Sequence, residues 1–342
     1  MIPAAARRFA FSHEAFAVAM LVVAVVVVTQ LSPYFFDSQN FSQIATDSLE
    51  IGLIALAMTP LIVMREIDLS VGSTLGLSAV VFGEMASADV PLLIAIVATV
   101  LLGALAGLVN GLLVTRFGLS SIVVTLGTMA LYRGLANAIV GDETITTLPE
   151  SFVASDTRLA IGTLITVPHV LFALAALAAA LTLHRTTFGR RIFFSGSAPE
   201  VASMSGVRVD RMKIWLFVAT GAMAAVAALF MTSRLQSVRA DTGTGLELLV
   251  LTVVLLGGAD IRGGRGTIFG TLVALALVGV VRSGMALGDL PDQARVAVVG
   301  GLLLLSICAG VGIEALRRSL ARRRTTRRIR GDAEPLRPTP TT

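Results

Sequence analysis

Charged side chains are scarce in this sequence. Only 14% of its 342 residues are Asp, Glu, Lys or Arg, whereas 55% are hydrophobic, and the mean hydropathy is +0.85. Soluble globular domains carry about 25% charged residues, so the composition excludes a water-exposed domain as the main body of the chain. We therefore expect lipid to be its principal solvent, and we predict an all-α integral membrane protein.

Several residue types that catalysis requires are also rare. Lys213 is the only lysine, so no Gly-x-x-x-x-Gly-Lys phosphate loop exists and the chain cannot be its own P-loop ATPase. His13, His169 and His184 have no partner at metal-ligand spacing. Cys308, the only cysteine, excludes an intrachain disulfide and is expected to be a buried thiol. We predict a protein that is not an enzyme and that holds no metal or cofactor.

Ten apolar runs account for most of the chain. Crossing the roughly 30 Å hydrocarbon layer takes about 20 helical residues, so we predict about ten transmembrane helices in one membrane domain, residues 15–316. A retained N-terminal tail (1–14) precedes it, and a basic tail (317–342), expected to be disordered, follows it. The runs are 15–32, 42–64, 69–86, 91–115, 120–140, 160–184, 213–233, 246–257, 266–288 and 293–316.

One run, 246–257, is too short to span a bilayer alone. It must extend into the preceding "DTGTGLE" or form a partly unwound helix. Membrane proteins tolerate unwound backbone only where protein shields it from lipid. We therefore predict that other helices cover this segment.

The basic residues are distributed unevenly between the two sets of loops. Ten crossings place most of them on one side, together with both termini, and the positive-inside rule assigns that side to the cytoplasm. The nine arginines of the basic tail follow an apolar run, which favours anionic lipid over nucleic acid as their partner. The basic residues expected inside are Arg7, Arg8, Arg65, Arg116, Arg185, Arg190, Arg191, Arg208, Arg211, Lys213, Arg262 and Arg265.

Three arginines, Arg133, Arg282 and Arg295, fall within or near the ends of runs. Their long stems could carry the guanidinium to a membrane interface, or the side chains could line a polar pathway. Both interpretations stay open from the sequence alone.

Glycines mark helix contacts and a weak internal repeat. Gly103, Gly107 and Gly111 follow one another at four-residue steps, a spacing that lets two helix backbones approach closely in lipid. "DLSVGSTLG" at 68–76 resembles "DIRGGRGTIFG" at 260–270. The resemblance predicts a parallel repeat of helix groups, a plan found in many transporters.

The longest loop expected inside, 185–212, contains its own short helix. Ser197 and Glu200 flank a predicted capping box with Pro199 in the first turn, and Gly206 is a natural C-terminal stop. We predict a helix over about 198–205. It either rests on lipid or docks a soluble partner.

The stretch "LIVMREIDLSVGSTLGLSAV", Leu61 to Val80, sets charge between apolar runs. A tight turn at the inner face would place Arg65 at the interface and let Asp68 cap the next helix. Alternatively, Asp68 and Ser70 line the inner end of a transport path. The sequence leaves both interpretations open.

Four stretches resemble the permease subunits of bacterial ABC importers for sugars, the ribose, xylose and arabinose group, and most closely its autoinducer-2 and rhamnose permeases. They occur in the family's order and cover nearly the whole chain: "REIDLSVGSTLGL" at 65–77, "SSIVVTLGTMALYRGLA" at 120–136, "FGRRIFFSGSAPEVASMSGVRVDRMK" at 188–213 and "LLGGADIRGGRGTIFG" at 255–270. The family's first motif usually begins Gly-Gly, where this chain has Arg65 and Glu66.

The resemblance implies a permease in the cytoplasmic membrane with three partners. These are a P-loop ATP-binding subunit, an extracytoplasmic sugar-binding protein that meets outer loops such as Gly141 to Arg158, and a second, identical or related permease chain. It favours a path or inner-gate role for Asp68, Ser70, Gly72 and Gly266. The ATPase-coupling residues that it implies are Gly189, Arg190, Pro199, Glu200, Ala202, Ser205 and Gly206.

Two alternatives remain at this point. An ion-gradient-driven secondary carrier would need an acidic pair deep within the spans, where carboxylates are scarce here. A branched-chain amino-acid ABC permease is the nearest neighbour in the same class. Sugar specificity depends mostly on a binding protein that this chain does not contain.

Overall fold

The computed structural model describes residues 13–149, 152, 166–291 and separate positions between 294 and 312. Within these residues the regular structure is helical, apart from one isolated bridge between Ile145 and Val238. The predicted all-α class is confirmed. The elements are α2 (His13–Leu31), η1 (Pro33–Phe36), α3 (Ser38–Asp47), α4 (Leu49–Val63), α5 (Val71–Ser87), α6 (Leu92–Arg116), α7 (Ser121–Val140), α9 (Val167–Arg185), α10 (Thr187–Ser197), α11 (Pro199–Met204), α12 (Val209–Leu235), α13 (Leu246–Leu256) and α14 (Ile268–Leu287).

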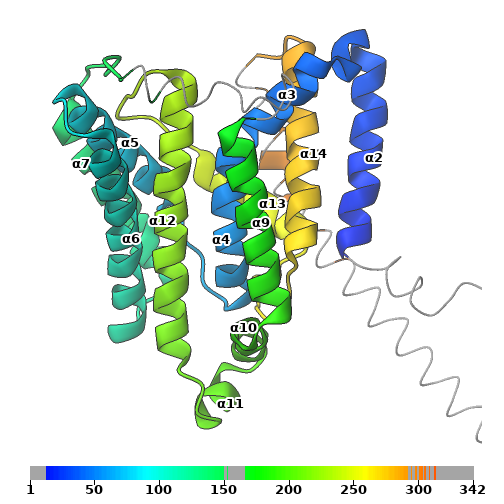
Figure 1. The fold of residues 1–342 in the computed structure, drawn as a ribbon. Coiled ribbons are helices and arrows are strands. Elements are labelled where there is room, and N and C mark those ends of the chain that lie inside the picture. The colour runs from blue at the N-terminus through cyan, green and yellow to red at the C-terminus, as the bar shows by residue number, and fades with distance from the viewer. Residues whose placement is uncertain are drawn as a thin grey trace, which may run out of the picture.

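The long helices stand side by side in a bundle, with α11 protruding at one end (Figure 1). Six described helices are long and apolar enough to cross a membrane, and the bent pair α3 and α4 makes a seventh candidate. Helices α5 and α13 are apolar but shorter. The structure thus supports six or seven spans; the number ten remains a prediction, since the last run lies mostly outside the described residues.

The predicted run 42–64 is not one straight helix. The chain turns by 44° between α3 and α4. Ser48 separates them, and its hydroxyl donates to the carbonyl oxygen of Ile44 at 2.7 Å. Helix α3 carries no buried residues, whereas nearly every residue of α4 is buried. Polar residues at 38–48 therefore form a separate helix at the rim, and only α4 enters the core.

The glycine stripe of α6 packs against α12, as its spacing predicts. A Cβ atom at Gly107 would overlap the carbonyl oxygen of Phe217, and one at Gly103 would overlap that of Gly221. At Gly111 it would lie 2.9 Å from the Cα of Ile214. A side chain larger than hydrogen does not fit between these backbones, so the glycines allow the two helices to approach closely.

Basic residues gather at the end of the bundle where α11 lies, which we call the α11 face. Arg65 follows α4, Arg116 ends α6, the series Arg185 to Lys213 accompanies α10 and α11, and Arg262 and Arg265 precede α14. Helix α2 also starts at this end (Figure 1). The predicted grouping is confirmed for these residues, whereas residues 1–12 and the basic tail lie outside the described residues.

One expectation about burial is wrong. Cys308 is exposed rather than buried. The outer surface of this bundle is largely apolar, with Leu93, Leu101 and Val123 each more than 60% exposed. A side chain in an apolar run can therefore face lipid, and an apolar context does not imply a place in the core.

Candidate functional site

The segment between α12 and α13 crosses half of the bundle without forming a helix. Val238 pairs with Ile145 near Gly83 of α5. Further along, Thr242 lies against Gly76, and Gly243 lies against Gly72. A Cβ at Gly72 would come within 2.7 Å of the Gly243 carbonyl oxygen, and one at Gly76 within 2.7 Å of that of Thr242. The glycines of α5 thus leave the room that this non-helical segment occupies.

Arg133 of α7 satisfies the carbonyl groups that this segment leaves without helical partners. Its guanidinium donates to the carbonyl oxygens of Ala240 at 2.5 Å, Thr242 at 2.8 Å and Gly72 at 3.3 Å. The predicted non-helical backbone before α13 is confirmed, and Val238, Ala240 and Gly243 of this segment are buried. Arg133 lines neither of the two cavities described below; its guanidinium stabilises non-helical backbone.

Asp68 belongs to a buried polar cluster where α5 begins. Its carboxylate accepts hydrogen bonds from the N–H of Ser70 at 2.9 Å, the Ser70 hydroxyl at 2.6 Å and the Asn110 amide of α6 at 3.5 Å. The side chain of Asn110 also donates to the Ser70 hydroxyl at 2.8 Å. Burial raises the pKa of the Asp68 carboxyl, and the hydrogen bonds from Ser70 and Asn110 act in the opposite direction.

The Asn110 oxygen in this cluster is buried and has no hydrogen-bond partner. Buried polar atoms normally find one, so the cluster offers one unused acceptor beside Asp68. Asp68 is 1% exposed and Ser70 is 0% exposed, so neither is open to solvent in this conformation. This geometry agrees with the structural interpretation of Asp68, because its carboxylate accepts the Ser70 N–H just before α5 begins.

Gly266 lies on the α11 face in the second copy of the suggested repeat. A Cβ there would come within 2.8 Å of Val63, the last residue of α4. The neighbouring Gly264 donates its N–H to the Val63 carbonyl oxygen at 2.8 Å. The stretch 260–270 therefore packs against the end of α4, and it leads into α14 as 68–76 leads into α5.

The loop between α9 and α12 forms two short helices, α10 and α11, at the end of the bundle (Figure 1). The expected helix at about 198–205 is confirmed as Pro199–Met204. It ends where Gly206 adopts φ +81°, and Val207 donates back to the Ala202 carbonyl oxygen. This return bond is typical of a glycine C-terminal stop.

The predicted capping box is wrong. Ser197 is the last residue of α10, and its hydroxyl donates to the Phe193 carbonyl oxygen at 2.8 Å instead of accepting from α11. Ala198 occupies the position before α11, without a side-chain cap. Helix α10, itself capped by the Thr186 hydroxyl accepting from the Gly189 N–H at 3.2 Å, therefore extends further than the sequence pattern indicates.

The residues expected to contact an ATPase divide into buried and exposed sets. Gly189 and Ala202 are buried, and Pro199 is half-buried. Two large apolar neighbours on the same tip are exposed as well: Met204 is 88% exposed and Val201 is 54% exposed. A groove of about 870 Å³ runs beside α11. The exposed members are Arg190, Glu200, Ser205 and Gly206.

Arg65 and Glu66 join this loop to the core, a role that the sequence did not indicate. Arg65 donates to the carbonyl oxygens of Gly196 at 2.7 Å and Ser197 at 2.9 Å, at the end of α10. Glu66 forms an ion pair with Lys213 of α12 at 2.5 Å. Arg65 has φ +67°, a conformation that favours glycine. Two adjacent charged residues thus tie the α4–α5 turn to the middle of the loop, where α10 ends, and to α12, which follows the loop.

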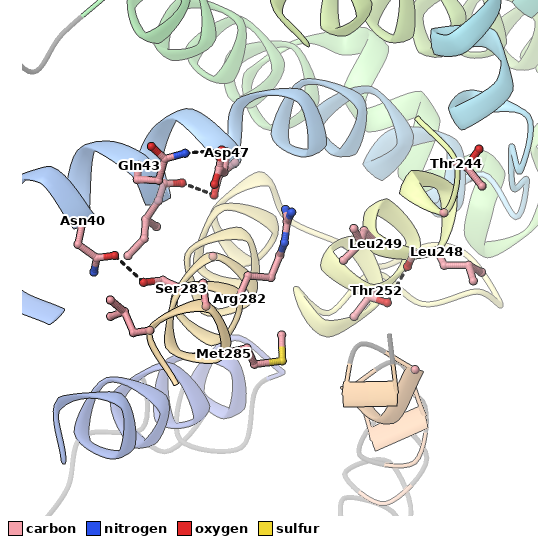
Figure 2. A pocket seen from close by; sticks show the side chains of 17 residues that line it. Asn40, Gln43, Asp47, Thr244, Leu248, Leu249, Thr252, Arg282, Ser283 and Met285 are labelled. Atoms are coloured by element: carbon pink, nitrogen blue, oxygen red, sulfur yellow. Dashed lines mark hydrogen bonds between the residues drawn. The ribbon is translucent and has the colours of Figure 1, made fainter. Parts of the chain in front are cut away.

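A cavity of about 770 Å³ opens between α3, α13 and α14, away from the α11 face (Figure 2). Arg282 of α14 extends into it. Asp68, Ser70, Gly72 and Gly266 do not line this cavity. No local sequence pattern predicts this cavity, because its walls come from segments about 200 residues apart.

Among the described residues, no group of three or more His, Cys, Asp or Glu side chains lies close enough together to hold a metal ion. His184 accepts the Ile268 N–H at 3.3 Å, where α14 begins, so this histidine has a structural partner.

These features define a multi-span helical membrane protein with a cavity lined by both apolar and polar side chains, with buried polar groups and with a helical loop at one end. The chain belongs to the family described as branched-chain amino acid transport system / permease component, whose model matches residues 40–307. It is a multi-pass protein of the inner membrane.

Among curated relatives, the Escherichia coli K12 protein named autoinducer 2 import system permease protein LsrD is 35% identical over 306 residues. The alignment covers 88% of this chain and 92% of the relative. The Shigella flexneri protein of the same name shows the same identity and coverage. No solved structure matches the chain.

Proposed function

We propose that this chain is the membrane-spanning permease subunit of an ATP-driven, binding-protein-dependent importer for a sugar-like small molecule of the autoinducer-2 type. The observation that carries the proposal is the similarity to permeases named for autoinducer 2 import, which covers nearly the full length of both chains. Rhamnose and ribose belong to the same chemical class of substrate.

The proposal assigns the α11 face to the cytoplasm. The basic residues gathered there support this orientation through the positive-inside rule. With ten crossings, both termini lie in the cytoplasm. The similar starts of α5 and α14 support a parallel repeat of helix groups, in which 68–76 corresponds to 260–270.

Helices α10 and α11 contact the ATP-binding subunit in this proposal. Their tip carries exposed apolar side chains, Val201 and Met204, next to the exposed charges of Arg190 and Glu200. This mixture is typical of a protein interface. The hydrogen bonds from Arg65 to the end of α10 supply a direct mechanical link from that interface to the start of α5.

The turn before α5 acts as the inner gate. Asp68 and Ser70 hold it closed through hydrogen bonds with Asn110, and Gly72 and Gly266 allow close packing against Gly243 and Val63. ATP binding and hydrolysis in the partner change the relative stability of the closed and open states through differential contacts at α11.

The remaining partners are a binding protein at the opposite face and a second permease chain. Asp142 and Glu143 are exposed at that face and offer charges to a basic surface. Glu150 and Asp156, which the sequence also suggested for this contact, lie outside the described residues.

Gentle extraction of the tagged protein from its native membrane, followed by mass spectrometry, tests the proposal. We expect a P-loop ATPase and a second permease chain to co-purify in near-stoichiometric amounts. Glu200→Lys on the exposed tip of α11 should release the ATPase, whereas Arg239→Glu, at the opposite end of the bundle, should not. A preparation that contains no ATPase but transports in response to an ion gradient would contradict the proposal.

A further inference from the structure

The cavity between α3, α13 and α14 has the size and the mixed lining of a small-molecule site. Its volume of about 770 Å³ lies within the range of ligand pockets, roughly 300–1,000 Å³. Leu248, Leu249 and Met285 supply apolar wall, and amide and hydroxyl groups lie opposite them (Figure 2). Such a combination suits a ring whose faces are apolar and whose edge carries hydroxyl groups.

Arg282 supplies hydrogen-bond donors that no described residue accepts. It lines the cavity, and it forms no hydrogen bond or ion pair within the part of the chain that the structure describes. A guanidinium carries five N–H donors, and leaving them unpaired inside a membrane protein is costly. An oxygen-rich molecule in the cavity would remove that cost.

Acceptors face the same space and are held in position by their own hydrogen bonds. The Ser283 hydroxyl donates to the Asn40 side-chain oxygen at 2.7 Å, and Asn40 donates to the Phe35 carbonyl oxygen at 2.9 Å. Gln43 donates to Asp47 at 3.0 Å. After these bonds, Ser283 and Gln43 each keep an oxygen that can accept. A ligand hydroxyl can accept a hydrogen bond from Arg282 and donate one to Ser283 or Gln43. It therefore matches this wall better than a group that only donates or only accepts.

The charges around the cavity cancel, which favours an uncharged ligand. Arg234 forms ion pairs with Asp47 and Glu50, each at 3.0 Å. That triad has one excess negative charge, and Arg282 balances it. The summed charge of these four side chains is therefore zero, so it attracts neither an anionic nor a cationic ligand.

We propose that this cavity binds the transported molecule itself, a small uncharged polyhydroxylated compound, with Arg282 as a specificity-determining residue. The proposal rests on the proposed import function and deepens it. It places a substrate site within the permease, on the side opposite the ATPase-coupling loop. The closed inner cluster of Asp68 and Ser70 lies elsewhere, so binding in the cavity and opening of the gate are separate steps.

Thiol labelling tests occupancy of the cavity directly. With Cys308 replaced by Ser, because it is exposed, Leu248→Cys places a reporter on the cavity wall, where Leu248 is 49% exposed. Ala88→Cys, on an exposed loop at the same end of the bundle, is the control. Both variants are purified as the complete importer complex, and autoinducer 2, rhamnose and ribose are added singly before a small maleimide.

We expect the compound that the complex transports to slow labelling at Leu248→Cys several-fold and to leave Ala88→Cys unchanged. Arg282→Gln should abolish this protection and raise the KM for uptake about tenfold, the effect of losing one charged hydrogen bond. Arg239→Gln, outside the cavity, should change neither the protection of Leu248→Cys nor the KM for uptake. Equal thermal stability of Arg282→Gln and the wild type confirms that the effect is not misfolding.

The two proposals fail in different ways. If the wild-type complex takes up none of these compounds with ATP, the import function is contradicted. If it takes up a compound that neither protects Leu248→Cys nor depends on Arg282, the import function stands and the cavity site is refuted. Protection that appears with lipid alone, without any transported compound, would also refute it, because it would identify a lipid as the occupant.

Discussion

Replacement of Arg133 by Met is the sharpest test of the non-helical segment before α13. The change keeps an apolar stem of similar length and removes the donors to the Ala240, Thr242 and Gly72 carbonyl oxygens. Each buried carbonyl left unpaired costs about 1–3 kcal/mol. Counting only the two shorter bonds, we expect a loss of about 2–6 kcal/mol, a large part of the stability of a typical protein, about 5–15 kcal/mol.

Thermal unfolding in detergent, followed by fluorescence-detected size exclusion, measures this loss. Arg133→Met should unfold at a clearly lower temperature than the wild type, and Arg133→Lys should lie between them, because one ammonium group cannot reach all three carbonyls. Arg239→Met removes an arginine that is 62% exposed and should have little effect. If Arg133→Met unfolded at the wild-type temperature, the reasoning about shielded backbone in this segment would be refuted.

Three further predictions concern the α11 face and the helix contacts. The free energy of unfolding of Arg65→Gly should exceed that of Arg65→Ala by about 1 kcal/mol, because φ +67° strains any residue with a Cβ. Arg65→Gly should therefore unfold at a higher temperature, and equal unfolding temperatures would contradict this reasoning. Gly107→Val should prevent recovery of folded protein because its side chain overlaps the α12 backbone, whereas Gly127→Ala, with open space around it, should be neutral in the same size-exclusion assay. Asp68→Ala should abolish uptake while the complex still assembles, and Asp68→Asn should be milder because it keeps an acceptor for Ser70; wild-type uptake by Asp68→Ala would limit Asp68 to a structural role.

Features that depend on local pattern could be predicted from the sequence. The apolar runs, the short unwound span before α13, the helix at Pro199–Met204 and the glycine face of α6 follow from hydropathy, length and residue spacing. The distribution of basic residues between the two ends also followed, because it depends only on the order of crossings. Apart from the distribution of basic residues, each of these signals lies within a window of about 30 residues.

Features that depend on distant contacts could not be predicted. Arg133 donates to carbonyls 107 and 109 positions away, and Arg65 bonds residues 131 and 132 positions away. The cavity likewise needs α3 and α14 together. The predicted capping box was wrong for a related reason. Ser197 matches the pattern, but it is the last residue of α10, and its hydroxyl donates to the Phe193 carbonyl oxygen within that helix. A sequence pattern identifies groups able to bond, and only the fold selects their partners.

ATP-driven uptake by the reconstituted complex tests the central claim most directly. The tagged permease, with the ATPase, permease chain and binding protein that accompany it, is placed in liposomes with ATP on the side of α11, and radiolabelled autoinducer 2 is added opposite. The proposed function predicts accumulation that requires ATP, the binding protein and an intact α11. Accumulation by this chain alone, driven by an ion gradient and indifferent to ATP, would contradict it.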